Sequence, residues 1–122
     1  MYKYKLAYPS RWVGEVAKCA RDYCCNDLGI VNKPRLSYLA EMPEGDPGPA
    51  VATNAREING FVCDASAIYL VLHSNDYSNL HQLVSTTCHE TYHVYQLIKG
   101  LEVTEPPADE YAERMTRKIV LG

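Results

Sequence analysis

Residues 87–96 have the sequence Thr-Cys-His-Glu-Thr-Tyr-His-Val-Tyr-Gln, which contains the pattern His-Glu-x-x-His. On an α-helix, residues four apart lie on the same face. His89 and His93 can therefore direct both imidazoles at one ion, at the ~2.0–2.1 Å length of zinc–nitrogen bonds. Glu90 follows one step around the helix. It would lie beside the ion without binding it, which is the place of a general base for a zinc-activated water.

Independent features place this pattern on a helix. Asn79 can cap the start of the helix with Gln82 as capping-box partner, and Gly100 lies where a C′ glycine would end it. No proline or glycine interrupts residues 79–99. The alternative is a chance match, with two histidines satisfied by ordinary hydrogen bonds. An apolar stripe gives the helix a core-facing side: Leu80, Leu83, Val84, Val94, Leu97 and Ile98.

Length and charge limit the classes of protein to consider. The 122 residues suit one domain, 1–122, with a single core. The net charge is −3 and the basic residues are scattered, so we expect no nucleic-acid partner. The longest apolar run, residues 67–72, is too short to span a membrane, and no apolar signal segment follows the N-terminus. A cytoplasmic protein without membrane contact is therefore expected.

The cysteines predict packing rather than cross-linking. There are five of them, an odd number, and none forms a Cys-x-x-Cys pair, so a zinc ribbon or a complete disulfide framework does not fit. We expect reduced and mostly buried thiols. Cys88 adjoins His89, but its side chain leaves the helix about 100° away, which predicts packing and not metal binding.

The rest of the chain predicts an α+β fold. A first helix runs from Ser10 as cap to Leu28, with Gly29 as its stop. Residues 35–41 suit a short strand, residues 43–49 form a Pro/Gly loop, and residues 58–63 and 67–73 form a hairpin in a small, mostly antiparallel twisted sheet. A C-terminal helix begins at or just after Glu105. The spacing in the first helix directs these side chains to the core: Trp12, Val16, Cys19, Ala20 and Tyr23.

The hairpin also predicts how a substrate is held. Residues 68–72 are almost continuously apolar, which is typical of an inner strand, so its partner should be an exposed edge. The unpaired backbone of Asn59, Gly60, Phe61 and Val62 could then bind a peptide by strand addition, with Gly60 allowing a close approach. The alternative is that Gly60 marks only a hairpin irregularity such as a bulge.

A catalytic zinc needs a third protein ligand and an open position for water. Spacing alone does not choose among the acidic residues that follow the motif helix. The candidates are Glu102, Glu105, Asp109, Glu110 and Glu113.

The pattern His-Glu-x-x-His followed by Glu-x-x-Ala-Asp at residues 105–109 resembles that of the gluzincin metallopeptidases, in particular their small single-domain members, the minigluzincins. The resemblance covers residue 58 to the C-terminus and implies a minimal zincin-like domain. It implies that Glu105 is the third zinc ligand and that Asp109 accepts a hydrogen bond from a ligand imidazole. The short spacing from His93 and the Pro-Pro pair after Glu105 keep Glu110 and Glu113 open as alternative ligands.

The predicted function is therefore hydrolysis of a peptide or protein substrate with Zn²⁺ as cofactor and Glu90 as general base. Tyr111 or His73 could stabilise the oxyanion. One alternative is a latent or inactive zincin-fold binding or regulatory module that keeps the zinc site. Another is a structural zinc site closed by Cys63 or His73. The sequence does not predict the oligomeric state.

Overall fold

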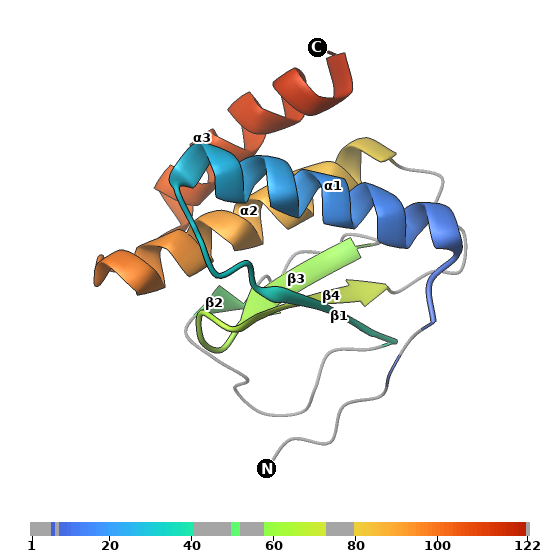
Figure 1. Cartoon of the computed structure of the whole chain (residues 1–122), viewed down its shortest axis with the longest axis horizontal. Coiled ribbons are helices and arrows are strands. Elements are labelled where there is room, and N and C mark those ends of the chain that lie inside the picture. The colour runs from blue at the N-terminus through green and yellow to red at the C-terminus, as the bar shows by residue number, and fades with distance from the viewer. Residues whose placement is uncertain (1–5, 7, 41–49, 52–57, 73–79, 122) are drawn as a thin grey trace.

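The computed structural model describes residues 6, 8–40, 50–51, 58–72 and 80–121 (Figure 1). Its elements confirm the predicted α+β class, with one helix before the strands and two after them. In chain order they are α1 (Arg11–Leu28), β1 (Arg35–Leu39), β2 (Ala50–Val51), β3 (Ile58–Val62), β4 (Ala67–Leu72), α2 (Leu80–Lys99), α3 (Glu105–Thr116) and a π-helical turn, η1 (Arg117–Leu121).

The strands form one sheet in the order β1-β4-β3-β2. β4 pairs with β1 in parallel and with β3 antiparallel, and β3 pairs with β2 antiparallel, which confirms a mostly antiparallel sheet. The apolar strand β4 lies between two neighbours, as predicted. Side chains that alternate along a strand reach both faces, and on β4 both faces are covered.

The prediction that residues 59–62 form an exposed edge is wrong for the end of β3. Phe61 pairs with Val51 on one side and with Tyr69 on the other, and Val62 pairs with Ala50, so β2 occupies the side of the strand that was expected to be open. The side chains of Phe61 and Val62 are also fully buried. The loop predicted for residues 43–49, which precede the short strand β2, lies outside the described residues. The two residues of β2 give no clear strand pattern in the sequence. The predicted peptide binding by Asn59 and Gly60 stays a prediction.

Helices cover one face of the sheet (Figure 1). Ile68, Leu70 and Val62 point from the sheet into a core that also contains Val13 of α1 and Leu83 of α2. On the opposite face, Leu39, Phe61 and Val71 make a second cluster, where the Phe61 ring stacks on Tyr69. α2 contacts α1, α3, β3 and β4, so the motif helix is at the centre of the fold. None of the helices in the described residues is long and apolar enough to cross a membrane.

The face that α1 turns to the core was predicted only in part: Ala20 is buried and Val16 packs against the core, but Cys19 and the two aromatic residues are exposed. Trp12 is 41 % exposed and Tyr23 is 46 % exposed. The helix is rotated by about one residue, or roughly 100°, so that small side chains meet α2 and the aromatic rings lie at the border with solvent. Gly29 ends the helix as predicted, with a φ of 73°. The residues of α1 that are buried are Val13, Ala17, Ala20, Cys24 and Cys25.

The ends of α2 and α3 determine how the two helices meet. Gly100 has a φ of 68°, and the amides of Gly100 and Leu101 bond to the carbonyls of Leu97 and Gln96, a Schellman motif that ends α2 as predicted. The predicted cap Asn79 lies outside the described residues. α3 begins at Glu105, with both prolines in its first turn, where they remove no helical hydrogen bond. Only residues 100–104 separate the helices, so the start of α3 lies against α2.

Candidate metal centre

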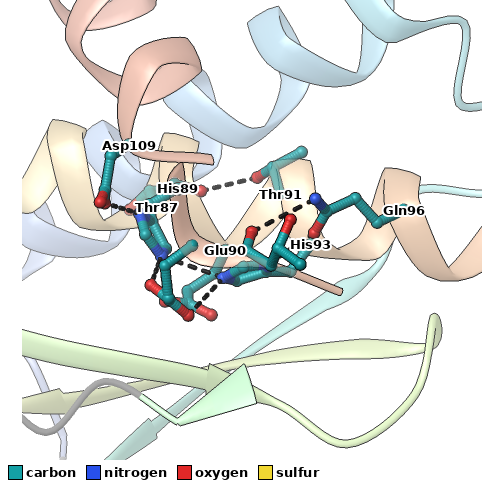
Figure 2. A network of polar contacts seen from close by, with 9 residues as sticks. Thr87, His89, Glu90, Thr91, His93, Gln96 and Asp109 are labelled. Atoms are coloured by element: carbon teal, nitrogen blue, oxygen red, sulfur yellow. Dashed lines mark hydrogen bonds and ion pairs between the residues drawn. The ribbon is translucent and has the colours of Figure 1, made fainter. Parts of the chain in front are cut away.

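The two motif histidines point at the same place. They lie one turn apart on α2, and their Nε2 atoms are 3.0 Å from each other (Figure 2). His93 is fully buried and His89 is 9 % exposed. The i, i+4 spacing therefore brings the two nitrogens together as the sequence predicts.

Glu105 joins these nitrogens from the first turn of α3. Its Oε2 lies 2.8 Å from Nε2 of His89, and its Oε1 lies 3.2 Å from Nε2 of His93. In a tetrahedral site with zinc bonds near 2.0–2.1 Å, neighbouring donor atoms would lie about 3.3 Å apart. The three donor pairs, at 2.8 to 3.2 Å, approach that separation. The structure thus brings together His89, His93 and Glu105.

The other nitrogen of each ring faces a hydrogen-bond acceptor. Nδ1 of His89 is 3.0 Å from Oδ1 of Asp109, the contact that the resemblance implied for Asp109. Nδ1 of His93 is 2.7 Å from Oε1 of Gln96. The amide nitrogen of Gln96 donates to the carbonyl of Thr104 at 3.3 Å, which leaves Oε1 as the atom that faces the ring. Both imidazoles therefore carry their proton on Nδ1 when neutral.

This tautomer leaves a lone pair on each Nε2. The two lone pairs and the negative oxygens of Glu105 then converge, an arrangement in which the donors repel one another unless a cation or proton lies between them. Burial, together with the nearby His93, lowers the pKa of His89, although Glu105 and Asp109 act in the opposite direction. A lowered pKa favours the neutral imidazole, which is the form that binds metal ions.

Glu90 lies beside the three donors His89, His93 and Glu105, but farther from His89 than the donors are from one another. Its Oε2 is 3.9 Å from Nε2 of His89, longer than the separations among the three donors. The side chain is 1 % exposed and is packed between α2 and strand β3, where Gly60 is its neighbour. Figure 2 shows the Glu90 side chain directed toward the sheet next to the two histidines. The position suits a base that acts on a molecule held by the donors.

Gln96 was not identified from the sequence. It follows His93 by three residues on α2, and its amide connects the His93 ring to the segment that precedes Glu105. A glutamine near a helix end is common, so no pattern singled it out. A polar residue at i+3 from a ligand histidine is the feature that could have found it, because such residues share a helix face.

The other residues considered from the sequence, as oxyanion donors or as further metal ligands, are not part of this group in the described residues. Tyr111 donates its hydroxyl to Oδ2 of Asp27 on α1 at 3.0 Å, which ties it to that helix. Cys88 packs in the cluster formed by α1, α2 and α3, as predicted. Cys63 packs against the Phe61 cluster on the far face of the sheet. His73 lies outside the described residues.

The acidic alternatives are not part of the group either. Within the described residues, the side chains that could hold a metal ion form two overlapping groups: His89, Glu90 and His93, and His89, Glu105 and Asp109. Neither group contains Glu102, Glu110 or Glu113, and Glu113 instead pairs with Arg117 at 2.6 Å.

Comparison of the chain with models of known protein families, with curated proteins and with solved structures finds no match. The case for the site therefore comes from its own residues. The structure shows a His/Glu group, carried by two successive helices and able to hold a metal ion.

Proposed function

We propose that this chain is a zinc-dependent metallopeptidase in which His89, His93 and Glu105 bind Zn²⁺ and Glu90 is the general base. The observation that carries the proposal is the convergence of two Nε2 lone pairs and a carboxylate within 3.2 Å, with each Nδ1 proton directed at an acceptor. The resemblance of the two helices to the gluzincin pattern supports the same ligand set.

The donor set fits zinc and a catalytic type of site. Two imidazoles and one carboxylate are the ligands of several zinc peptidases, and three protein ligands leave a fourth position for water. The side chain of Glu105 is 52 % exposed, so the group reaches the surface on the side of α3. A structural zinc would instead be enclosed by four protein ligands.

Each residue then has a separate task. Bound zinc would acidify a water molecule in the open position and polarise the carbonyl of a peptide bond. Glu90 would accept a proton from the attacking water at its carboxylate and return it to the leaving amine. Asp109 and Gln96 hold the two imidazoles in the tautomer that presents Nε2 to the ion. The buried position of Glu90 keeps its carboxylate from turning away into solvent.

The burial of Glu90 also favours a second candidate function. At 1 % exposure the carboxylate is not open to a large substrate in this conformation. A latent zinc-binding module, which holds the ion but cleaves little, would have the same structure. Turnover of a substrate separates the two candidates, because only the peptidase releases new amino termini.

The proposed function predicts hydrolysis that depends on zinc. The chain, loaded with one equivalent of Zn²⁺, should cleave an unfolded polypeptide such as a reduced and carboxymethylated protein. Mass spectrometry of the products would locate the cleavages, and a chelator should stop them until zinc is restored. A chain that binds zinc but releases no peptide after prolonged incubation would identify the latent module instead.

Replacing Asp109 should weaken zinc binding without abolishing it. In Asp109→Asn the group facing Nδ1 of His89 loses its charge, and loss of such a partner typically lowers metal affinity or activity about 10–100-fold. Competition with a coloured zinc chelator measures the affinity. Glu110→Gln is a matched control, because Glu110 is an exposed neighbour on α3 that lies outside the metal groups. Complete loss of zinc in Asp109→Asn would make Asp109 a ligand.

A further inference from the structure

Strand β3 carries a glycine directly beneath the proposed base. Gly60 pairs with Leu70 in a regular antiparallel register, so the strand has no bulge at this point and the irregularity considered from the sequence is excluded. Its φ is not positive, in contrast to those of Gly29 and Gly100. The backbone conformation at residue 60 is therefore open to any amino acid, and glycine normally weakens a strand.

The reason for a glycine lies in the space above it. A Cβ atom at residue 60 would lie 2.7 Å from Cγ of Glu90, 3.2 Å from Cδ of Glu90 and 3.1 Å from Cγ2 of Thr86. Real Cβ atoms essentially never approach another carbon to 2.7 Å. The side chain of Glu90 occupies the volume that any other residue at position 60 would fill.

The atom that would be displaced is close to the helix backbone. Cγ of a glutamate is placed by χ1 alone, and a helix allows χ1 only two common rotamers. A methyl group at residue 60 would therefore force Glu90 out of its rotamer, and this change would swing the carboxylate away from His89. Moving only the tip of the side chain does not remove the contact.

We propose that Gly60 is a positioning residue for Glu90: the missing side chain at residue 60 leaves the space that holds the Glu90 carboxylate beside the metal ligands. This inference rests on the proposed function, since Glu90 needs a fixed place only as a base. It gives Gly60 a role that differs from peptide binding through the strand backbone. The three atoms nearest to the added Cβ belong to Glu90 and Thr86 and not to His89, His93 or Glu105, so we expect zinc binding to be unaffected.

The first test is independent of zinc and of catalysis. Gly60→Ala should lower the midpoint of thermal unfolding of the zinc-free chain by several degrees. In a Glu90→Ala background, where Cγ and Cδ are absent, most of that loss should disappear. The same cycle with Thr86→Ser, which removes only Cγ2, should recover less. The proposal would be overturned if Gly60→Ala lowered the unfolding midpoint equally in the wild-type and Glu90→Ala backgrounds. It would also be overturned if Thr86→Ser restored the midpoint and Glu90→Ala did not.

A matched control is available on α1. An added Cβ at Gly14 has no atom within 4 Å, so Gly14→Ala introduces the same methyl group without a contact. Since alanine is the better helix former, its unfolding midpoint should stay the same or rise.

The second test uses the zinc-loaded chain. In Gly60→Ala, kcat should fall about 100-fold, because misplacing a reacting group by about an ångström costs that much. KM and zinc affinity should remain close to those of the wild type. Loss of zinc in Gly60→Ala would show that residue 60 acts on the metal ligands. An unchanged kcat would show that the Glu90 carboxylate keeps its position beside an added methyl group. Either result overturns the proposal. If the wild-type chain hydrolyses no substrate but the destabilisation by Gly60→Ala still depends on Glu90, the peptidase function is refuted and the contact between Gly60 and Glu90 is retained.

Discussion

In His93→Ala, zinc binding should be lost. His93 supplies one of three converging donors, and its removal leaves one imidazole and one carboxylate, too few for a tightly held zinc ion. Removing a hydrogen-bonding partner of a ligand typically lowers zinc affinity about 10–100-fold. The loss of zinc affinity in His93→Ala should be larger than that. Metal analysis after dialysis measures the zinc content, which should be near one equivalent in the wild type and near zero in the variant.

The unfolding of the same variant provides a second measurement. Zinc at about 100 times its dissociation constant should add about 2.7 kcal/mol to the free energy of unfolding of the wild type. His93 is buried, so His93→Ala also leaves a cavity, and only the increment produced by zinc is compared. His81→Ala is the matched control, because His81 is exposed on the same helix and should keep the full increment. A zinc increment that survives in His93→Ala would refute the site.

In Glu90→Gln, hydrolysis should fall about 10²–10⁴-fold while zinc content stays unchanged, because a base contributes a rate factor of that size without being a ligand. Glutamine has nearly the same shape as glutamate, so the packing over Gly60 is kept and only the proton acceptor is lost. Initial rates of peptide release, measured together with zinc content in the same preparation, provide the comparison.

Glu102→Gln is the control for this change, because it removes the same charge from an exposed position outside the metal groups. It should retain wild-type rates. Loss of zinc in Glu90→Gln would make Glu90 a ligand, as its place in one of the candidate groups permits. Full activity in Glu90→Gln would assign the proton transfer to another residue.

Much of the fold can be predicted from local patterns. The His-Glu-x-x-His spacing, the uninterrupted helix around it and the glycine that ends it are all properties of one segment, and the structure has them at Leu80–Lys99 and Gly100. The apolar run that became β4 likewise indicated an inner strand. The start of α3 followed from two prolines that only a first turn tolerates.

The face of α1 and the end of β3 were mispredicted because contacts with other elements decided both. The apolar and aromatic residues of α1 surround much of the helix, so spacing does not define a single face, and the small residues that allow close packing against α2 decided it. At β3, the two-residue strand β2, the preceding element in the chain, pairs with Phe61 and Val62. A strand of two residues is too short to show the alternation of apolar and polar residues by which strands are recognised in a sequence.

The sequence by itself determined that two imidazoles meet on one helix face, because that contact is made within a single turn. Only the tertiary structure decided which acid reaches them, since Glu105, Glu110 and Glu113 differ in how α3 packs against α2 rather than in chemistry. It also decided that the amide of Gln96 reaches the carbonyl of Thr104 and that Glu90 fills the space above Gly60. These contacts join segments whose separation in the chain says nothing of their distance in space. They form only when the helices and the sheet pack around one core.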